Sequence, residues 1–102
     1  MRQTLTALIL TQNNEETIEK TLLSIKDFVS DVVIVDGYSK DKTIQIVHKV
    51  FKVRKVYKVF FHNYFDIGEQ RAFGLEHVTG DWVLILDSDE IVTKQLAKEI
   101  VS

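Results

Sequence analysis

The 102-residue sequence contains no cysteine, no proline and only four glycines. Without cysteine there are no disulfides, thiolate metal sites or thiol nucleophiles, so a metal would have to bind through oxygen or imidazole. The net charge of -2 lacks the basic excess that nucleic acid binding favours. No apolar run approaches the ~18 residues of a membrane span, and the start lacks the cleavage site of a signal peptide. These absences predict a cytoplasmic protein without a nucleic acid partner.

The composition is that of one soluble globular domain, with 45% hydrophobic and 27% charged residues. A chain of this length can bury about 65% of the surface that it exposes when unfolded, which is enough for one core. We therefore expect residues 1–102 to form a single domain.

Short apolar runs rich in Val and Ile alternate with stretches whose apolar residues recur at helical spacing. Strand followed by helix, repeated with short connections, implies right-handed crossovers and a parallel sheet. The sequence therefore predicts a doubly wound α/β fold, with a mostly parallel sheet and helices on both faces. The predicted strands are 4–10, 31–36, 54–61 and 82–86, and the helices centre on residues 18–25, 44–51, 72–78 and 92–100.

Further details follow from local patterns. The runs 32–35 and 82–86 are almost purely apolar, which indicates central strands buried on both faces, whereas 54–61 alternates with basic residues and indicates an edge. We read Trp82 as structural. Gly80 is expected to end the third helix in a left-handed conformation. The residues expected to cap helix starts are Ser39, Asp41 and Thr93.

Polar clusters follow three of the predicted strands, at 11–16, 36–43 and 87–90. Ligands of open α/β sheets bind at the carboxyl ends of strands. Asp87 and Asp89 are two residues apart, a spacing that places both carboxylates on one side of an extended chain. A divalent cation relieves their repulsion, and Mg²⁺ favours a few carboxylates combined with phosphate oxygens. The alternative is a solvated turn whose aspartates cap the last helix.

Three segments in this order resemble the donor-binding, N-terminal half of family 2 glycosyltransferases of the GT-A fold. They are "TALILTQNNEETIEKTLLSI" (6–25), "VVIVDGYSKDKT" (32–43) and "GEQRAFGLEHVTGDWVLILDSDE" (68–90). The resemblance implies that the chain binds a nucleotide-diphospho-sugar, with a UDP-sugar favoured, for transfer of the sugar to an acceptor glycan or lipid.

The resemblance also implies roles for single residues in binding the nucleoside. Asp36 matches the aspartate that hydrogen-bonds the base, and Ser39 matches the serine of the same motif. Tyr38 departs from the small residue that is common at its position. The remaining matches to nucleoside contacts are Thr11, Gln12, Asn13 and Glu15.

By the same resemblance, Arg71 lies near the diphosphate, where a forked, permanently charged guanidinium suits phosphate oxygens. Asp87 and Asp89 match the metal and ribose aspartates of the family: both are assigned to Mg²⁺ or Mn²⁺, with Asp89 as the usual direct ligand, and Asp87 is also assigned to the donor. Members of the family continue beyond this motif with the acceptor site and a general base, which inverting transfer requires. No residue here matches that base, so catalysis stays open and a non-catalytic binding module or fragment is the alternative.

Other interpretations remain open. A D-x-D motif after an apolar strand also occurs in haloacid-dehalogenase-like phosphatases, although there it normally follows the first strand. The basic run 49–58 is either a solvated face or a peripheral contact with anionic lipid. Unpaired strand edges favour a symmetric homodimer. The three histidines lack the spacing of a zinc site.

Overall fold

The computed structural model describes residues 3–52, 56–63 and 66–101. Four parallel strands form one sheet in the order β3-β2-β1-β4, with helices between them along the chain. This confirms the predicted α/β fold. The strands are β1 (Leu5–Thr11), β2 (Asp31–Asp36), β3 (Val56–Phe61) and β4 (Trp82–Asp87), and the helices are α1 (Ile18–Ile25), α2 (Thr43–Phe51), α3 (Ile67–Leu75) and α4 (Lys94–Val101).

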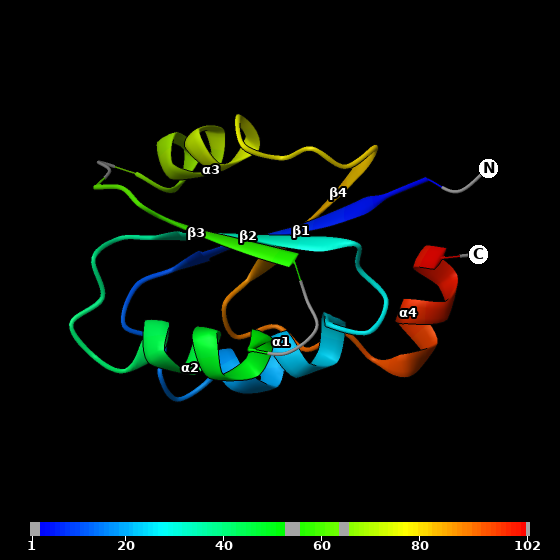
Figure 1. The fold of residues 1–102 in the computed structure, drawn as a ribbon, viewed down its shortest axis with the longest axis horizontal. Helices are drawn as coiled ribbons and strands as arrows, with labels where there is room; N and C mark the ends of the chain where they lie inside the picture. Colours follow the sequence, from blue (N-terminus) through cyan, green and yellow to red (C-terminus); the bar gives the residue numbers. More distant parts are fainter. Residues whose placement is uncertain (1–2, 53–55, 64–65, 102) are drawn as a thin grey trace.

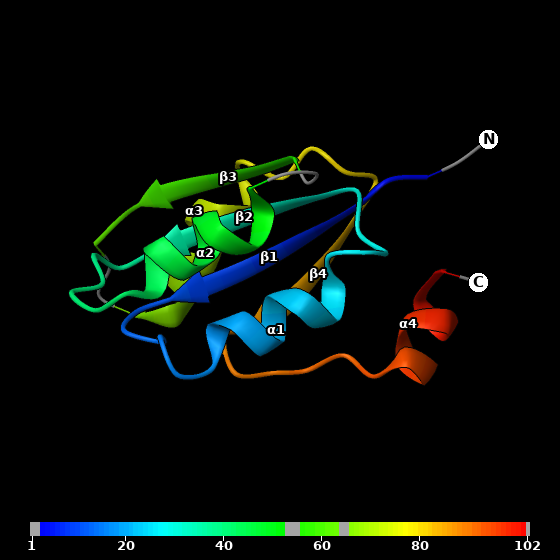
Figure 2. The ribbon, with the colours of Figure 1, turned by 60° about the horizontal axis from the view of Figure 1, so that its bottom comes forward.

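Helices cover both faces of the sheet, as Figure 1 shows: α1 and α2 lie on one face and α3 lies on the other. The larger apolar cluster lies on the face of α1 and α2, because the buried faces of both helices meet alternate residues of β1 and β2 there. A smaller cluster under α3 is built on Leu8, Val33 and Val35. The strands therefore form a rigid platform whose carboxyl ends lie together (Figure 2).

The strand order corrects one prediction from the apolar pattern. The run 82–86 forms β4, which pairs only with β1 among the described strands and is therefore an edge rather than a central strand. Leu84 and Leu86 pack on the core, whereas Val83 and Ile85 are exposed. Trp82 is 59% exposed, and its indole N–H donates to the side-chain carbonyl of Gln3 at 2.8 Å.

The expected edge strand β3 is confirmed, although residues 54 and 55 of the predicted range lie outside the described residues. These two positions also belong to the basic run 49–58. Within the described ranges, no helix is both long enough and apolar enough to cross a membrane.

The predicted end of the third helix at Gly80 is wrong. Helix α3 ends at Leu75, Glu76 keeps a helical φ of -64°, and no described glycine has a positive φ. Gly80 is needed instead for a close approach, since a Cβ there would lie 3.0 Å from the backbone nitrogen of Thr6.

One of the three predicted caps is observed: the Thr93 hydroxyl accepts from the backbone N–H of Leu96 in α4. Asp41 accepts from the backbone N–H of Thr43, but it lies one residue before Lys42, the N-cap of α2, which has no side-chain cap hydrogen bond. Ser39 does not cap a helix, because its hydroxyl donates to Asp36. Residue 92, expected within the last helix, lies before α4 begins.

Candidate functional site

The loops that follow β1 and β2 are joined by hydrogen bonds at the carboxyl edge of the sheet. The N–H of Asn13 donates to the Ser39 hydroxyl at 2.8 Å, and the Asn13 side-chain carbonyl accepts from the N–H of Lys40 at 2.7 Å. The side-chain NH₂ of Gln12 donates to the backbone carbonyl of Gly37 at 3.1 Å. Asn13 has φ of 56°, a left-handed conformation that asparagine tolerates well. The two loops therefore form one structural unit.

Two acidic residues extend this unit toward α2. Glu15 accepts from the N–H of Lys42 at 2.9 Å, and Asp41 accepts from the N–H of Glu15 at 3.1 Å. Desolvation raises the pKa of Asp41, but hydrogen bonds from the side chain and backbone of Thr43 and from the backbone of Glu15 together outweigh it, so the pKa is lowered. The Asp41 carboxylate thus stabilises the paired loops.

Asp36 lies at the end of β2 and is fully buried. One carboxylate oxygen accepts from the hydroxyls of Thr11 and Ser39, each at 2.6 Å, and the other accepts from the N–H of Ser39 at 2.7 Å. The bond from Thr11 joins the ends of β1 and β2, and the two bonds from Ser39 fix the loop after β2. The contact between Asp36 and a base stays a prediction.

The segment 87–90 turns immediately after β4. The N–H of Glu90 donates to the carbonyl of Asp87 at 3.1 Å, and the Glu90 carboxylate accepts from the N–H of Asp87 at 2.7 Å. The expectation of two carboxylates along an extended chain is therefore wrong, because the backbone reverses between them. Asp87 and Asp89 are both exposed at this turn.

The turn is anchored to the start of α1. The carbonyl of Ser88 accepts hydrogen bonds from the hydroxyls of Thr17 and Thr21, both at 3.0 Å. Sequence analysis missed these threonines, although their spacing of four residues places them on one side of a helix, beside the apolar stripe of Ile18 and Leu22. They connect the end of β4 to the loops after β1 and β2.

The described residues hold no group of three or more His, Asp or Glu side chains that could bind a metal by itself. The exposed carboxylates of Asp87 and Asp89 instead fit a hard cation that takes part of its coordination shell from a phosphate-bearing ligand. A pocket of about 320 Å³ lies at the same edge, lined by residues 13–17 and Asp41.

Arg71 lies in α3, on the opposite face of the sheet from α1 and α2. Its Nε is buried and has no hydrogen-bond partner within the described ranges. A buried donor without a partner is costly, so an acceptor supplied by a ligand would stabilise it. Within the described ranges, the Nε of Arg71 makes no hydrogen bond to the other predicted site residues.

Sequence analysis also missed a structured histidine at the end of β3. The N–H of His62 donates to the carbonyl of Asp36 at 3.0 Å, which extends the edge to a third strand. Gln70 is fully buried, and its side-chain NH₂ donates to the backbone carbonyl of His62 at 2.9 Å. The side-chain carbonyl of Gln70 therefore faces the imidazole of His62 and accepts from its Nδ1–H at 2.8 Å. The ring stacks on Phe73 with centroids 3.9 Å apart. These contacts fasten α3 to β3.

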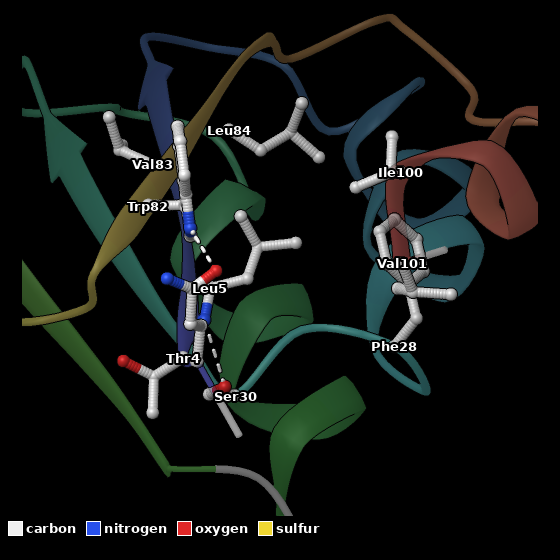
Figure 3. A pocket seen from close by; sticks show the side chains of 10 residues that line it. Thr4, Leu5, Phe28, Ser30, Trp82, Val83, Leu84, Ile100 and Val101 are labelled. Atoms are coloured by element: carbon white, nitrogen blue, oxygen red, sulfur yellow. Dashed lines mark hydrogen bonds between the residues drawn. The ribbon is translucent and has the colours of Figure 1, made fainter. Parts of the chain in front are cut away.

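A larger pocket, of about 890 Å³, lies at the opposite end of the sheet (Figure 3). It opens between the starts of β1 and β4 and the end of α4, and none of the described residues that line it carries a charge. Because ligands of open α/β sheets bind at the carboxyl ends of strands, the polar loops form the stronger candidate site. The pocket is lined by Gln3, Thr4, Leu5, Phe28, Ser30, Trp82, Val83, Leu84, Ile100 and Val101.

Known proteins share the sequence and the fold of this chain. An uncharacterized glycosyltransferase of Rickettsia bellii is 31% identical over 96 residues, which cover 94% of this chain and 31% of the relative. The crystal structure of residues 1–349 of TarS from Staphylococcus aureus in complex with UDP is 32% identical, with a TM-score of 0.83 over 95% of this chain and 30% of that chain. The mannosyltransferase PcManGT from Pyrobaculum calidifontis, in complex with GDP-Man and Mn²⁺, has the same TM-score of 0.83 at 24% identity and covers 98% and 32% of the two chains, which shows the shared fold.

The chain spans about a third of the length of the rickettsial relatives that it matches, and less of TarS. The sequence model of glycosyl transferase family 2 matches residues 6–102, which is nearly the whole chain. All three segments that carry the resemblance, and every predicted site residue, fall inside that match. The chain therefore belongs to glycosyl transferase family 2.

Proposed function

We propose that residues 1–102 form the donor-binding unit of a glycosyltransferase and bind a nucleotide-diphospho-sugar at the carboxyl edge of the sheet. One observation carries the proposal: hydrogen bonds connect the three polar segments at this edge. Ser88, between Asp87 and Asp89 in the turn 87–89 (the D-S-D turn), accepts from two threonines at the start of α1. The loop after β1, which leads into α1, is in turn bonded to the loop after β2. A ligand lying along this edge would meet all three segments at once. A UDP-sugar is favoured, since TarS, at 32% identity, binds UDP in its crystal structure.

We assign the cation to the D-S-D turn. Asp87 and Asp89 would hold Mg²⁺ or Mn²⁺, and the ion would neutralise the diphosphate that leaves during transfer. The exposure of both carboxylates supports this assignment, because a cation shared with a diphosphate needs an open side. Arg71 would supply further positive charge to the diphosphate, and its unpartnered buried Nε supports that role.

Binding is tested by titration calorimetry with UDP, GDP and their sugar esters, with and without Mn²⁺. We expect Asp89→Asn to lose roughly tenfold or more in affinity in the presence of Mn²⁺, because one charge-assisted ligand is removed without a change of shape. Asp27→Asn, at an exposed position outside the edge, is the matched control and should bind like the wild type. If no nucleotide binds to the wild type with Mn²⁺, the proposal is wrong.

Transfer itself requires an acceptor site and a general base in addition to a bound donor. No residue of this chain matches the family's base, so we expect the isolated chain to hydrolyse a sugar nucleotide slowly at most. The assay is release of nucleoside diphosphate with and without glycan or lipid acceptors. Robust acceptor-stimulated release would contradict this expectation, whereas binding without turnover would favour the alternative of a non-catalytic module.

The phosphatase alternative has lost its support. The D-S-D turn follows the fourth strand and lies within the match to the glycosyltransferase family, so its aspartates are better explained as cation ligands than as a nucleophile and its acid. Hydrolysis of a general phosphomonoester, abolished by Asp87→Asn, would restore the phosphatase hypothesis.

A further inference from the structure

Two large aromatic side chains lie exposed at the carboxyl edge of the sheet. Tyr38 follows β2 and is 53% exposed, and Phe61 ends β3 and is 49% exposed. Their rings contact each other, with centroids 5.8 Å apart and planes inclined by 35°. An exposed aromatic pair is unusual on a small domain unless it contacts a partner or ligand.

The backbone of Tyr38 is strained. Its φ is 59°, and the other described non-glycine residue with positive φ is Asn13. Asparagine adopts this conformation readily, but a bulky tyrosine does so at a steric cost. The half-exposed ring recovers little of that cost through burial, so packing within the chain gives a weak reason for tyrosine here. A strained residue that is not explained by packing points to a functional role.

The pair faces the same side as the loops of the candidate site. In β3, Tyr57 and Val59 pack on the core next to α1 and α2, while Phe60 lies against α3. Since side chains alternate along a strand, Phe61 lies on the side of Tyr57 and Val59. That side carries α1 and α2 and the loops leading into them. Phe61 is also in register with Asp36, two residues before Tyr38.

The position also suits the length of the ligand. Strands β2 and β3 lie two and three places from β4 in the sheet. At about 4.8 Å per strand, the pair and the D-S-D turn are therefore roughly 10–14 Å apart. An extended nucleoside diphosphate spans such a separation, with its base at one end and its outer phosphate at the other. Aromatic faces accept bases by stacking, which does not require a specific hydrogen-bond pattern.

We propose that Tyr38 and Phe61 form the surface on which the nucleobase of the donor stacks, an inference that rests on the proposed function. This assigns the base to the β2–β3 end of the edge and the diphosphate to the β4 end. It also gives a reason for a tyrosine in a strained backbone conformation at position 38.

The test uses Tyr38→Asn, which keeps a residue suited to positive φ and removes the ring, and Tyr38→Phe, which keeps the ring. Affinities for UDP and for inorganic pyrophosphate are measured by calorimetry, both with Mn²⁺. We expect Tyr38→Asn to weaken UDP binding roughly five- to hundredfold, the range for loss of one aromatic stacking partner. Pyrophosphate binding should be unchanged, and Tyr38→Phe should bind UDP like the wild type. Phe61→Leu should likewise weaken UDP binding without changing pyrophosphate binding.

Thermal melting separates stacking from folding. Relief of strain should leave the melting temperature of Tyr38→Asn unchanged or raised, so weaker UDP binding by a variant that is at least as stable supports the proposal. Unchanged UDP affinity in both ring-removing variants, or an equal loss for UDP and pyrophosphate, would overturn it. If the wild type binds UDP no more tightly than pyrophosphate, the proposed stacking surface is wrong while the proposed cation site stands. If it binds neither ligand, the proposed function fails and the stacking surface fails with it.

Discussion

Replacing Gly74 with alanine tests whether the close contact between α3 and the sheet controls the position of Arg71. A Cβ at Gly74 would lie 2.6 Å from Cδ1 of Leu8 and 3.0 Å from Cγ2 of Val35, and both of these side chains are buried. Overpacking of this kind costs about 1–3 kcal/mol. Alanine regains about 1 kcal/mol through its higher helix propensity. We therefore expect a net loss of about 1 kcal/mol in the free energy of unfolding.

Gly68 provides the matched control within the same helix. Among the described residues, a Cβ there would meet only the side-chain oxygen of Asp66, at 3.3 Å, so Gly68→Ala should stabilise the protein by about 0.5–1 kcal/mol. The two variants should then differ by roughly 10 °C in melting temperature, given about 4–8 °C per kcal/mol for a domain of this size. Displacement of α3 by Gly74→Ala should also weaken binding of UDP through Arg71. If Gly74→Ala melts at or above Gly68→Ala, the close packing under α3 is not a constraint.

Two further predictions concern acid stability and assembly. The pKa of Asp41 is lower in the folded chain than its ordinary value of 3.8, so its contribution to stability is present above that value and is lost as the pH falls through the folded pKa. Urea unfolding between pH 2 and 7 should therefore show a smaller loss of unfolding free energy in acid for Asp41→Asn than for the wild type. Identical curves would contradict this. The unpaired edge of β4 in the described chain, with exposed Val83 and Ile85, should support self-association at micromolar concentration, and Val83→Lys should weaken it in sedimentation experiments, whereas a monomeric wild type would refute it.

Local patterns predicted the elements but not their order in the sheet. The spacing of Ile18, Leu22 and Ile25 predicted α1, and all three are fully buried. The apolar run 82–86 also predicted a strand, yet that strand lies at an edge. Periodicity reports how apolar a segment is on each side, while strand order depends on pairing between distant segments. An apolar run therefore cannot distinguish a central strand from an edge strand whose outer side is left exposed.

In the candidate site too, the location of the polar segments was predictable from the sequence, whereas the contacts of single side chains were not. The polar clusters after β1, β2 and β4 were expected at one edge, and the structure brings them there. The orientation of individual groups was not predictable, because it depends on contacts between segments. Ser39 was expected to cap a helix but bonds Asp36, and the turn at Ser88 is held by threonines more than 60 residues earlier in the chain. Spacing rules describe neighbours in sequence, and these partners are neighbours only in the fold.

The two threonine hydroxyls on the Ser88 carbonyl have a consequence for the order in which ligands bind. A carbonyl oxygen offers two lone pairs, and Thr17 and Thr21 occupy both, so this backbone oxygen is withdrawn from any cation at the turn. A cation held there as proposed would have to complete its shell from water or from the diphosphate. Free Mn²⁺ should bind weakly on its own, and the nucleotide should raise its affinity by the same factor by which Mn²⁺ raises that of the nucleotide, since linked equilibria are reciprocal. Under the proposed function, each of the two ligands, cation and donor, would therefore depend on the other for tight binding.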